Sequence, residues 1–110
     1  MTKYTNSQNS PRYAFVNASA SGNTAVVAAQ GAGVQIRVLG FIVVTTLAQT
    51  VKFQSATTDI SAGFPLAATG GISTTYFPDG MFETAANEAL NINLGAATAT
   101  GVQVVWEPVT

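Results

Sequence analysis

The middle of the chain carries the sequence Val34-Gln-Ile-Arg-Val-Leu-Gly-Phe-Ile-Val-Val44. Its first half alternates between apolar and polar residues, as a strand that is buried on one face does. Further along, the apolar residues Leu39, Phe41 and Val43 take the opposite phase. A glycine at such a slip, here Gly40, is typical of a β-bulge or a sharp bend in a strand. The stretch therefore predicts a long strand with a break in its register.

Short alternating segments of the same kind occur along the rest of the chain, separated by clusters of Gly, Pro, Asn and Ser. They cover residues 13–16, 24–29, 51–55, 60–66, 72–77, 81–84, 90–94 and 102–106. We expect segment 60–66 to lie at a sheet edge, because it contains Gly63 and Pro65. Residues 85–89 are expected to form a loop.

The last two segments alternate most clearly. Leu90, Ile92 and Leu94 share one face, as do Val102, Val104 and Trp106. We expect the two segments to pair as a hairpin across the loop 95–101. Pro108 is expected to end the last strand, because proline has no N–H to donate.

About eight strands at spacings near ten residues, with no convincing helix, predict an all-β protein. We expect a single-domain antiparallel β-sandwich or jelly roll formed by residues 13–110. The polar residues 1–12 are expected to form a flexible N-terminal arm. A chain of 110 residues is long enough for one such domain.

The composition argues against several classes of function. Four Lys or Arg and five Asp or Glu make 8% of the chain charged, against a usual value of about 25%. His and Cys are absent, which removes the commonest metal ligands, general bases and nucleophiles. We therefore expect no enzyme, no catalytic or cofactor-binding residue and no metal site. Four cations are also too few for nucleic-acid binding.

The sequence gives no sign of a membrane span or a signal peptide. The longest strongly apolar run, Val38–Val44, has about seven residues, whereas a spanning helix needs about 20. Met1–Pro11 is polar and lacks the apolar stretch of a signal peptide. Membrane association and secretory export are therefore both expected to be absent.

Two motifs have ordinary structural interpretations. Glu83 and Glu88 are the nearest pair of carboxylates, and we expect them to cap backbone N–H groups or to pair with Arg37 or Lys52. The sequence Gly31-Ala-Gly33 lacks the further glycine, the lysine and the helix of a phosphate loop, so it predicts a turn.

The aromatic residues divide into two groups. We expect Phe41, Phe53 and Trp106 in the core, because each lies within an alternating apolar face. Residues beside the Pro78-Asp79-Gly80 turn and residues of the N-terminal arm are expected at an assembly interface, where aromatics, Met and Arg are enriched. These interface residues are Tyr4, Arg12, Tyr13, Tyr76, Met81 and Phe82.

Residues 39–46 also point to assembly. The segment is uncharged, rich in β-branched residues and free of proline, which is the signature of an aggregation-prone strand. Such a strand is tolerated when it lies centrally in a sheet or when another subunit covers it.

Three stretches resemble sequences of small virion proteins of tailed bacteriophages. They are Phe77–Leu94, its lead-in Phe64–Gly71, and Ser21–Thr24 before the second predicted strand. The resemblance covers roughly residues 20–107. It implies a compact jelly-roll structural protein, commonly trimeric, attached to a capsid, a tail or a fibre, with no catalytic residues.

The expected function is therefore that of a capsid decoration, or cement, protein that binds the assembled phage head as a homotrimer. Its partners would be itself and the major capsid protein or another virion protein. Its location would be the virion, assembled in the host cytoplasm. The alternative is a receptor-binding or fibre module of the tail or head that recognises host surface glycan through loops such as 95–101.

Overall fold

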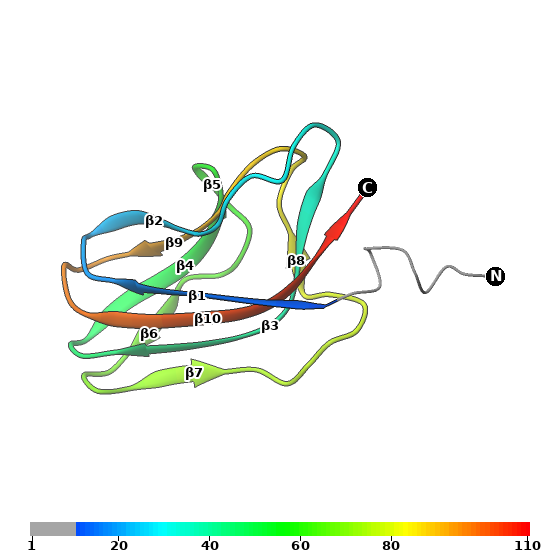
Figure 1. Cartoon of the computed structure of the whole chain (residues 1–110). Coiled ribbons are helices and arrows are strands. Elements are labelled where there is room, and N and C mark those ends of the chain that lie inside the picture. Colours follow the sequence, from blue (N-terminus) through cyan, green and yellow to red (C-terminus); the bar gives the residue numbers. More distant parts are fainter. Residues whose placement is uncertain (1–10) are drawn as a thin grey trace.

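The computed structural model describes residues 11–110, which form ten strands and no helix (Figure 1). The prediction of an all-β protein is thus confirmed. The strands are β1 (Arg12–Ala18), β2 (Gly22–Val27), β3 (Gln35–Thr45), β4 (Gln49–Ser55), β5 (Thr58–Asp59), β6 (Phe64–Leu66), β7 (Gly71–Ser73), β8 (Phe82–Glu83), β9 (Leu90–Leu94) and β10 (Thr100–Val109).

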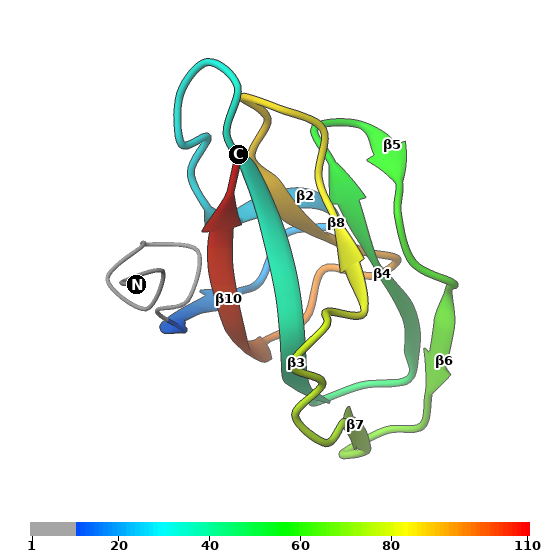
Figure 2. The same ribbon diagram turned by 90° about the vertical axis from the view of Figure 1, so that its right-hand side faces the viewer.

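The strands form two antiparallel sheets that pack as a β-sandwich (Figure 2). The first sheet has the order β1-β10-β3-β7, and β8 pairs with β3 beside β7. The second sheet has the order β2-β9-β4-β5, and β6 also pairs with β4. The strands β1 to β4 thus alternate between the sheets along the chain.

The core lies between the sheets and consists of the inward residues of each alternating segment. Phe53, Leu90, Ile92 and Val104 are fully buried, and the predicted core aromatics Phe41 and Trp106 are 3% and 6% exposed. The rings of Phe41 and Phe53 join the two sheets with centroids 4.9 Å apart. Tilted aromatic pairs at such distances add about 0.5–1.5 kcal/mol beyond their area burial.

The predicted slip in the central strand is a bulge at Leu39. Val105 of β10 lies opposite Gly40, and the next residue, Trp106, lies opposite Val38. Leu39 is therefore the extra residue of β3, and Val38 and Leu39 are both buried. Because side chains alternate along a strand, this one insertion keeps the apolar residues on both sides of the bulge inside the sandwich.

The segment after β7 follows the outer edge of β3. Thr74 N donates to Phe41 O at 3.0 Å, and Phe77 N donates to Leu39 O at 2.8 Å. A side chain at Gly40 would meet this segment, since its Cβ would lie 3.1 Å from Thr75 O. The predicted turn follows, with Gly80 N donating to Phe77 O at 2.9 Å.

Two further predictions about local structure are confirmed. Segment 60–66 lies at an edge of the second sheet, where β5 and β6 pair with β4. Residues 85–89 form a loop with a turn at Asn87, whose φ is +57°. Asparagine is one of the few residues that adopt this left-handed backbone readily.

The predicted hairpin of the last two long strands is wrong. β9 pairs with β2 and β4, and β10 pairs with β1 and β3, so the two strands lie in different sheets. The loop between them crosses from one sheet to the other. Ala96 N donates to the side chain of Gln49 on β4 at 3.1 Å, and Thr46 N, just after the end of β3, donates to Ala99 O at 3.1 Å.

Pro108 does not end β10, which runs to Val109. Pro108 lies opposite Ile36, whose N–H donates to Thr84 Oγ1 and whose carbonyl accepts from Thr84 N. The backbone groups of Ile36 thus point away from β10, and no N–H is needed from the residue opposite. Within residues 11–110, β1 pairs with β10 as far as Trp106, so Pro108 lies beyond that pairing, in a position of the kind where proline is tolerated.

The first strand begins at Arg12, one residue before the predicted start of the sandwich. The expected flexible arm, residues 1–12, therefore includes a strand residue at its end. Residues 1–10 lie outside the described part of the chain.

Replacing Phe53 should destabilise the fold far more than replacing an exposed residue of similar character. Phe53→Ala removes a fully buried ring that joins the sheets, and such changes cost about 3–5 kcal/mol. Leu47→Ala, at a side chain 57% exposed, should change stability by less than about 0.5 kcal/mol. Urea unfolding of the two variants and the parent measures both values, and equal losses would contradict this description of the core.

Candidate assembly interface

The outward side of the first sheet carries a group of exposed hydrophobic residues. Tyr13 and Phe15 on β1 are 75% and 73% exposed, and Ile42 and Val44 on β3 are 48% and 51% exposed. Val105 of β10 lies between the strands, opposite Tyr13. We call these residues the apolar face: Tyr13, Phe15, Ile42, Val44 and Val105. None of them carries a charge.

The strand register forms a trough in this face. One row across the sheet runs Asn17, Gly101, Val44, and the next runs Phe15, Gln103, Ile42. Because Gly101 has no side chain, the outer surface of the sheet is depressed between Asn17 and Val44. A hollow of about 240 Å³ lies there, with Phe15 on one side and Ile42 and Val44 on the other.

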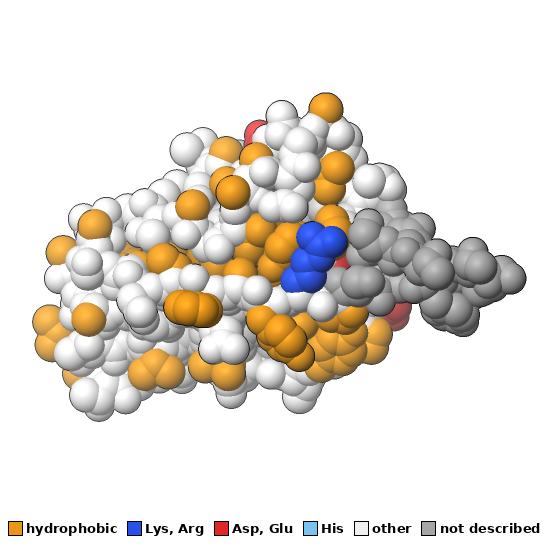
Figure 3. Space-filling model, in the orientation of Figure 1, with side chains coloured by type: hydrophobic (Ala, Val, Ile, Leu, Met, Phe, Trp, Pro, Cys, Tyr) orange, Lys and Arg blue, Asp and Glu red, His pale blue; other side chains and the backbone are white. Residues whose placement is uncertain are grey.

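A second, smaller hollow of about 140 Å³ lies further along the same face. Its lining includes Ile42, Val105 and Tyr76. Tyr76 reaches it from the segment that follows β7, which runs beside β3. Figure 3 shows orange side chains among white ones along the front and lower part of the molecule, while the blue side chains in view lie at the right, beside the grey residues.

Beyond the bulge the outward side of the sheet changes from apolar to charged. Arg37 pairs in register with Glu107 on β10 and with Glu83 on β8. Its Nε lies 3.0 Å from Glu83 Oε2, and its Nη1 lies 3.5 Å from Glu107 Oε2. The side chain of Glu107 is only 9% exposed, so Arg37 compensates a carboxylate that is largely removed from water.

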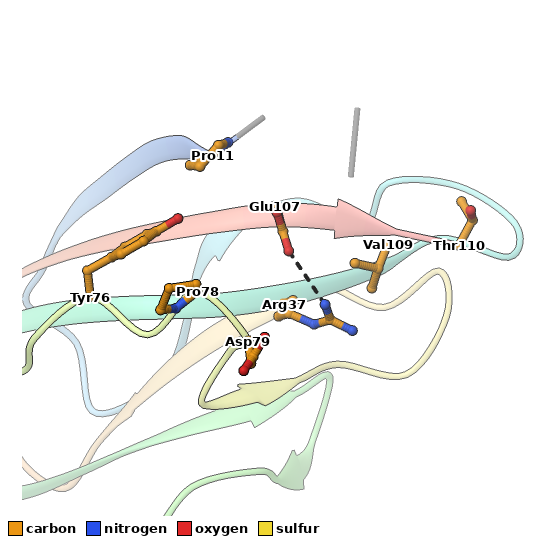
Figure 4. Close-up of a pocket in the computed structure, with 8 residues that line it drawn as sticks. All are labelled: Pro11, Arg37, Tyr76, Pro78, Asp79, Glu107, Val109 and Thr110. Carbon is orange, nitrogen blue, oxygen red and sulfur yellow. Dashed lines mark ion pairs between the residues drawn. The ribbon is translucent and has the colours of Figure 1, made fainter. Parts of the chain in front are cut away.

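This charged row borders a third hollow, of about 410 Å³ (Figure 4). Arg37 lies between Glu107 and Asp79, with Tyr76 further along the wall. Pro11 and Thr110 also line this hollow, so the first and last described residues lie at the same end of the sandwich. Charged residues of both signs thus gather at this end of the sandwich.

The three predicted interface residues near the start of the chain, Tyr4, Arg12 and Tyr13, differ from one another in their surroundings. Tyr13 is the most exposed large hydrophobic residue among those described. Arg12 is exposed, and its guanidinium carbon lies 5.4 Å from the centroid of the Trp106 ring. A cation over an indole face contributes about 0.5–1 kcal/mol at exposed sites. Tyr4 lies outside the described residues.

The three interface residues predicted near the turn also separate. Tyr76 is 53% exposed and borders the apolar face, and Met81 is 36% exposed. Phe82 instead points inward, with its ring centroid 5.4 Å from that of Phe53 and 6.3 Å from that of Phe41. Its position in β8, where it pairs with Val38, places it on the core side of the sheet. Phe82 is therefore half-buried, with its ring packed against the core.

Sequence reasoning missed Phe15, Ile42 and Val44 as surface residues. A signal was present, because residues 41–44 are apolar in both phases of the strand. A strand that is apolar on both faces either lies between two layers or presents one apolar face outward. Phe15 follows the same logic, since it alternates with the inward residues Ala14 and Val16.

The carboxylates form ion pairs and hydrogen bonds of a structural kind, and the predicted partner Arg37 is confirmed for Glu83, whereas the partner of Glu88 is a serine hydroxyl that was not predicted. Glu83 pairs with Arg37, and Glu88 accepts from Ser55 Oγ. Hydrogen bonds from the side chains of Gln54 and Lys52 lower the pKa of Asp59 below its ordinary value of 3.8. Within residues 11–110, no three acidic side chains cluster in a way that would hold a metal ion.

Comparison with known proteins yields no match to any family model and none to a curated protein. Among the described residues there is also no helix that is both long and apolar enough to span a membrane.

The two kinds of ion pair should respond differently when their cation is removed. Arg37→Met leaves the buried Glu107 without its partner and should cost about 1–3 kcal/mol. Lys52→Met breaks the pair with Asp59, a carboxylate whose side chain is 52% exposed, and should cost no more than about 1 kcal/mol. Thermal and urea unfolding at neutral pH compare the two. A smaller loss for Arg37→Met than for Lys52→Met would show that Arg37 does not stabilise Glu107.

Proposed function

We propose that this protein is a structural protein of a tailed-bacteriophage virion, a decoration protein that binds the assembled head as a homotrimer. The observation that carries the proposal is the uncharged apolar face of the first sheet. Besides other copies of itself, the protein would bind the major capsid protein or another virion protein. The sequence resemblance in residues 20–107 supplies the phage context.

The strand order supports the jelly-roll form of the sandwich. β1, β10, β3 and β7 lie side by side in one sheet, and β2, β9, β4 and β6 or β5 in the other. The strands β1 to β4 thus alternate between the sheets, and the first and last strands, β1 and β10, are neighbours. An eight-stranded, double-sheet jelly roll is the architecture of many viral capsid and lectin domains.

The distribution of charge supports a role in assembly. Contiguous apolar patches on soluble monomers mark interaction sites when they reach several hundred Å². The exposed side chains of the apolar face reach that range, and charged residues lie beyond its end in the row around Arg37. A surface of this kind gains free energy when another protein removes it from water.

The alternative, a glycan-binding module, finds less support. The loop 95–101 consists only of Gly, Ala and Thr, whereas sugar recognition relies on aromatic platforms and charged or amide side chains. Phe82, an aromatic residue near the Pro78-Asp79-Gly80 turn, packs against Phe53. The loop is also held by hydrogen bonds with Gln49 of β4 and with Thr46, the residue after β3.

Binding to phage particles tests the proposed function directly. Full-length protein is added to particles that lack it, and binding is measured by co-sedimentation and by cryo-electron microscopy. We expect density at many symmetry-related positions on the head. A chain that lacks residues 1–10 should remain folded but lose particle binding, because those residues form the expected anchoring arm.

The truncation stops before Pro11 because Arg12 begins β1 and covers Trp106. Circular dichroism and thermal unfolding of the truncated chain serve as its control. Density at only a few sites on the tail or a fibre would favour the alternative module. Undiminished decoration by the truncated chain would show that the arm is not the anchor.

A further inference from the structure

We propose that a second copy of this chain covers the apolar face, and that side chains of this copy fill the trough over Gly101. The inference rests on the self-association included in the proposed function, but not on attachment to a particle. It assigns the contact between copies to one side of the first sheet.

The size of the face fits such a contact. An aromatic side chain buries about 150–250 Å², so Tyr13 and Phe15, each about three-quarters exposed, offer roughly 300 Å² together. Ile42, Val44 and Val105 bring the apolar area to roughly 500 Å², near the upper end for a monomer. The uncharged residues Asn17 and Ser73 at the rim, and Gln103 between Phe15 and Ile42, extend it toward the roughly 800 Å² per partner of a stable interface.

The absence of charge on this face favours a copy of the same chain over a charged partner. Phe15, Gln103, Ile42 and Ser73 follow one another across the four strands. A partner with a charged surface would lose hydration here without gaining an ion pair. The same face on a second copy imposes no such penalty, since it brings no charge to the contact.

The shape of the face also fits a contact with a second copy. The apolar face has a ridge of Tyr13 and Phe15 on the edge strand β1, and beside it the trough lined by Ile42 and Val44. The ridge of a second copy provides side chains of the kind that would fill this trough.

Gly101 allows the trough to be filled without disturbing the fold. A Cβ at Gly101 would have Asn17 Oδ1 at 3.9 Å as its nearest neighbour, which is an ordinary contact distance. The backbone of Gly101 is not in the left-handed region. Valine is also favoured in strands. Gly101→Val should therefore fold normally and occupy the space that the second copy needs.

The experiment measures the oligomeric state of the full chain by light scattering and analytical ultracentrifugation at protein concentrations from about 1 to 100 μM, which span micromolar dissociation constants. The variants are Gly101→Val and Phe15→Ser, and the matched control is Ala25→Val, an exposed position on β2 of the other sheet. We expect the parent and Ala25→Val to be oligomeric. Each face variant should weaken association at least about 30-fold, the effect of losing a central interface residue.

Thermal unfolding of each variant confirms that it is folded, and particle binding is measured in parallel. An oligomer unchanged by Gly101→Val and Phe15→Ser would overturn this inference while leaving the proposed homotrimer intact. A parent that is monomeric throughout would overturn both the inference and the homotrimer. If that monomer still decorates particles, and Gly101→Val abolishes the decoration, the face binds a particle protein instead of a second copy.

Discussion

The one-residue bulge at Leu39 is the constraint on which the rest of this sandwich depends. Along β3 the apolar residues before and after Gly40 occupy opposite phases, so a regular strand would expose one set or the other. The insertion turns both sets inward and leaves Val38 and Leu39 buried side by side. It also divides the outward side of the first sheet into an apolar part and a charged part, since Arg37 and Glu107 both lie beyond it.

Alternation in the sequence was sufficient to predict which side chains are buried, as for Phe41, Phe53 and Trp106. It was not sufficient to predict which strands are neighbours. The segments 90–94 and 102–106 alternate equally well as a hairpin or as strands of opposite sheets, and the short loop between them permits either arrangement. The choice depends on long-range pairing of β10 with β1 and β3. Pro108 is likewise tolerated inside β10 because the backbone N–H of Ile36, opposite it, bonds to Thr84 instead. That arrangement is a feature of tertiary structure.

The residues of the candidate interface were only partly predictable from the sequence. Tyr13 and Tyr76 were expected at a surface and border the apolar face. Phe82 was expected beside them because it follows a turn, but two residues of β8 suffice to point its ring into the core. Ile42 and Val44 were visible only as an excess of apolar residues in one strand. The sequence does not show whether such an excess is covered by a second layer of the same chain.

The position of Pro11 and Thr110 around one hollow has a practical consequence for engineering. Thr110 lies nine residues beyond Gly101 on the same strand, which at about 3.3 Å per residue separates it by roughly 30 Å from the trough. A tag or cargo domain fused after Thr110 therefore emerges far from the trough over Gly101. The closeness of residues 11 and 110 also suits circular permutation, since a short linker joins them and new ends open in a loop such as 95–99.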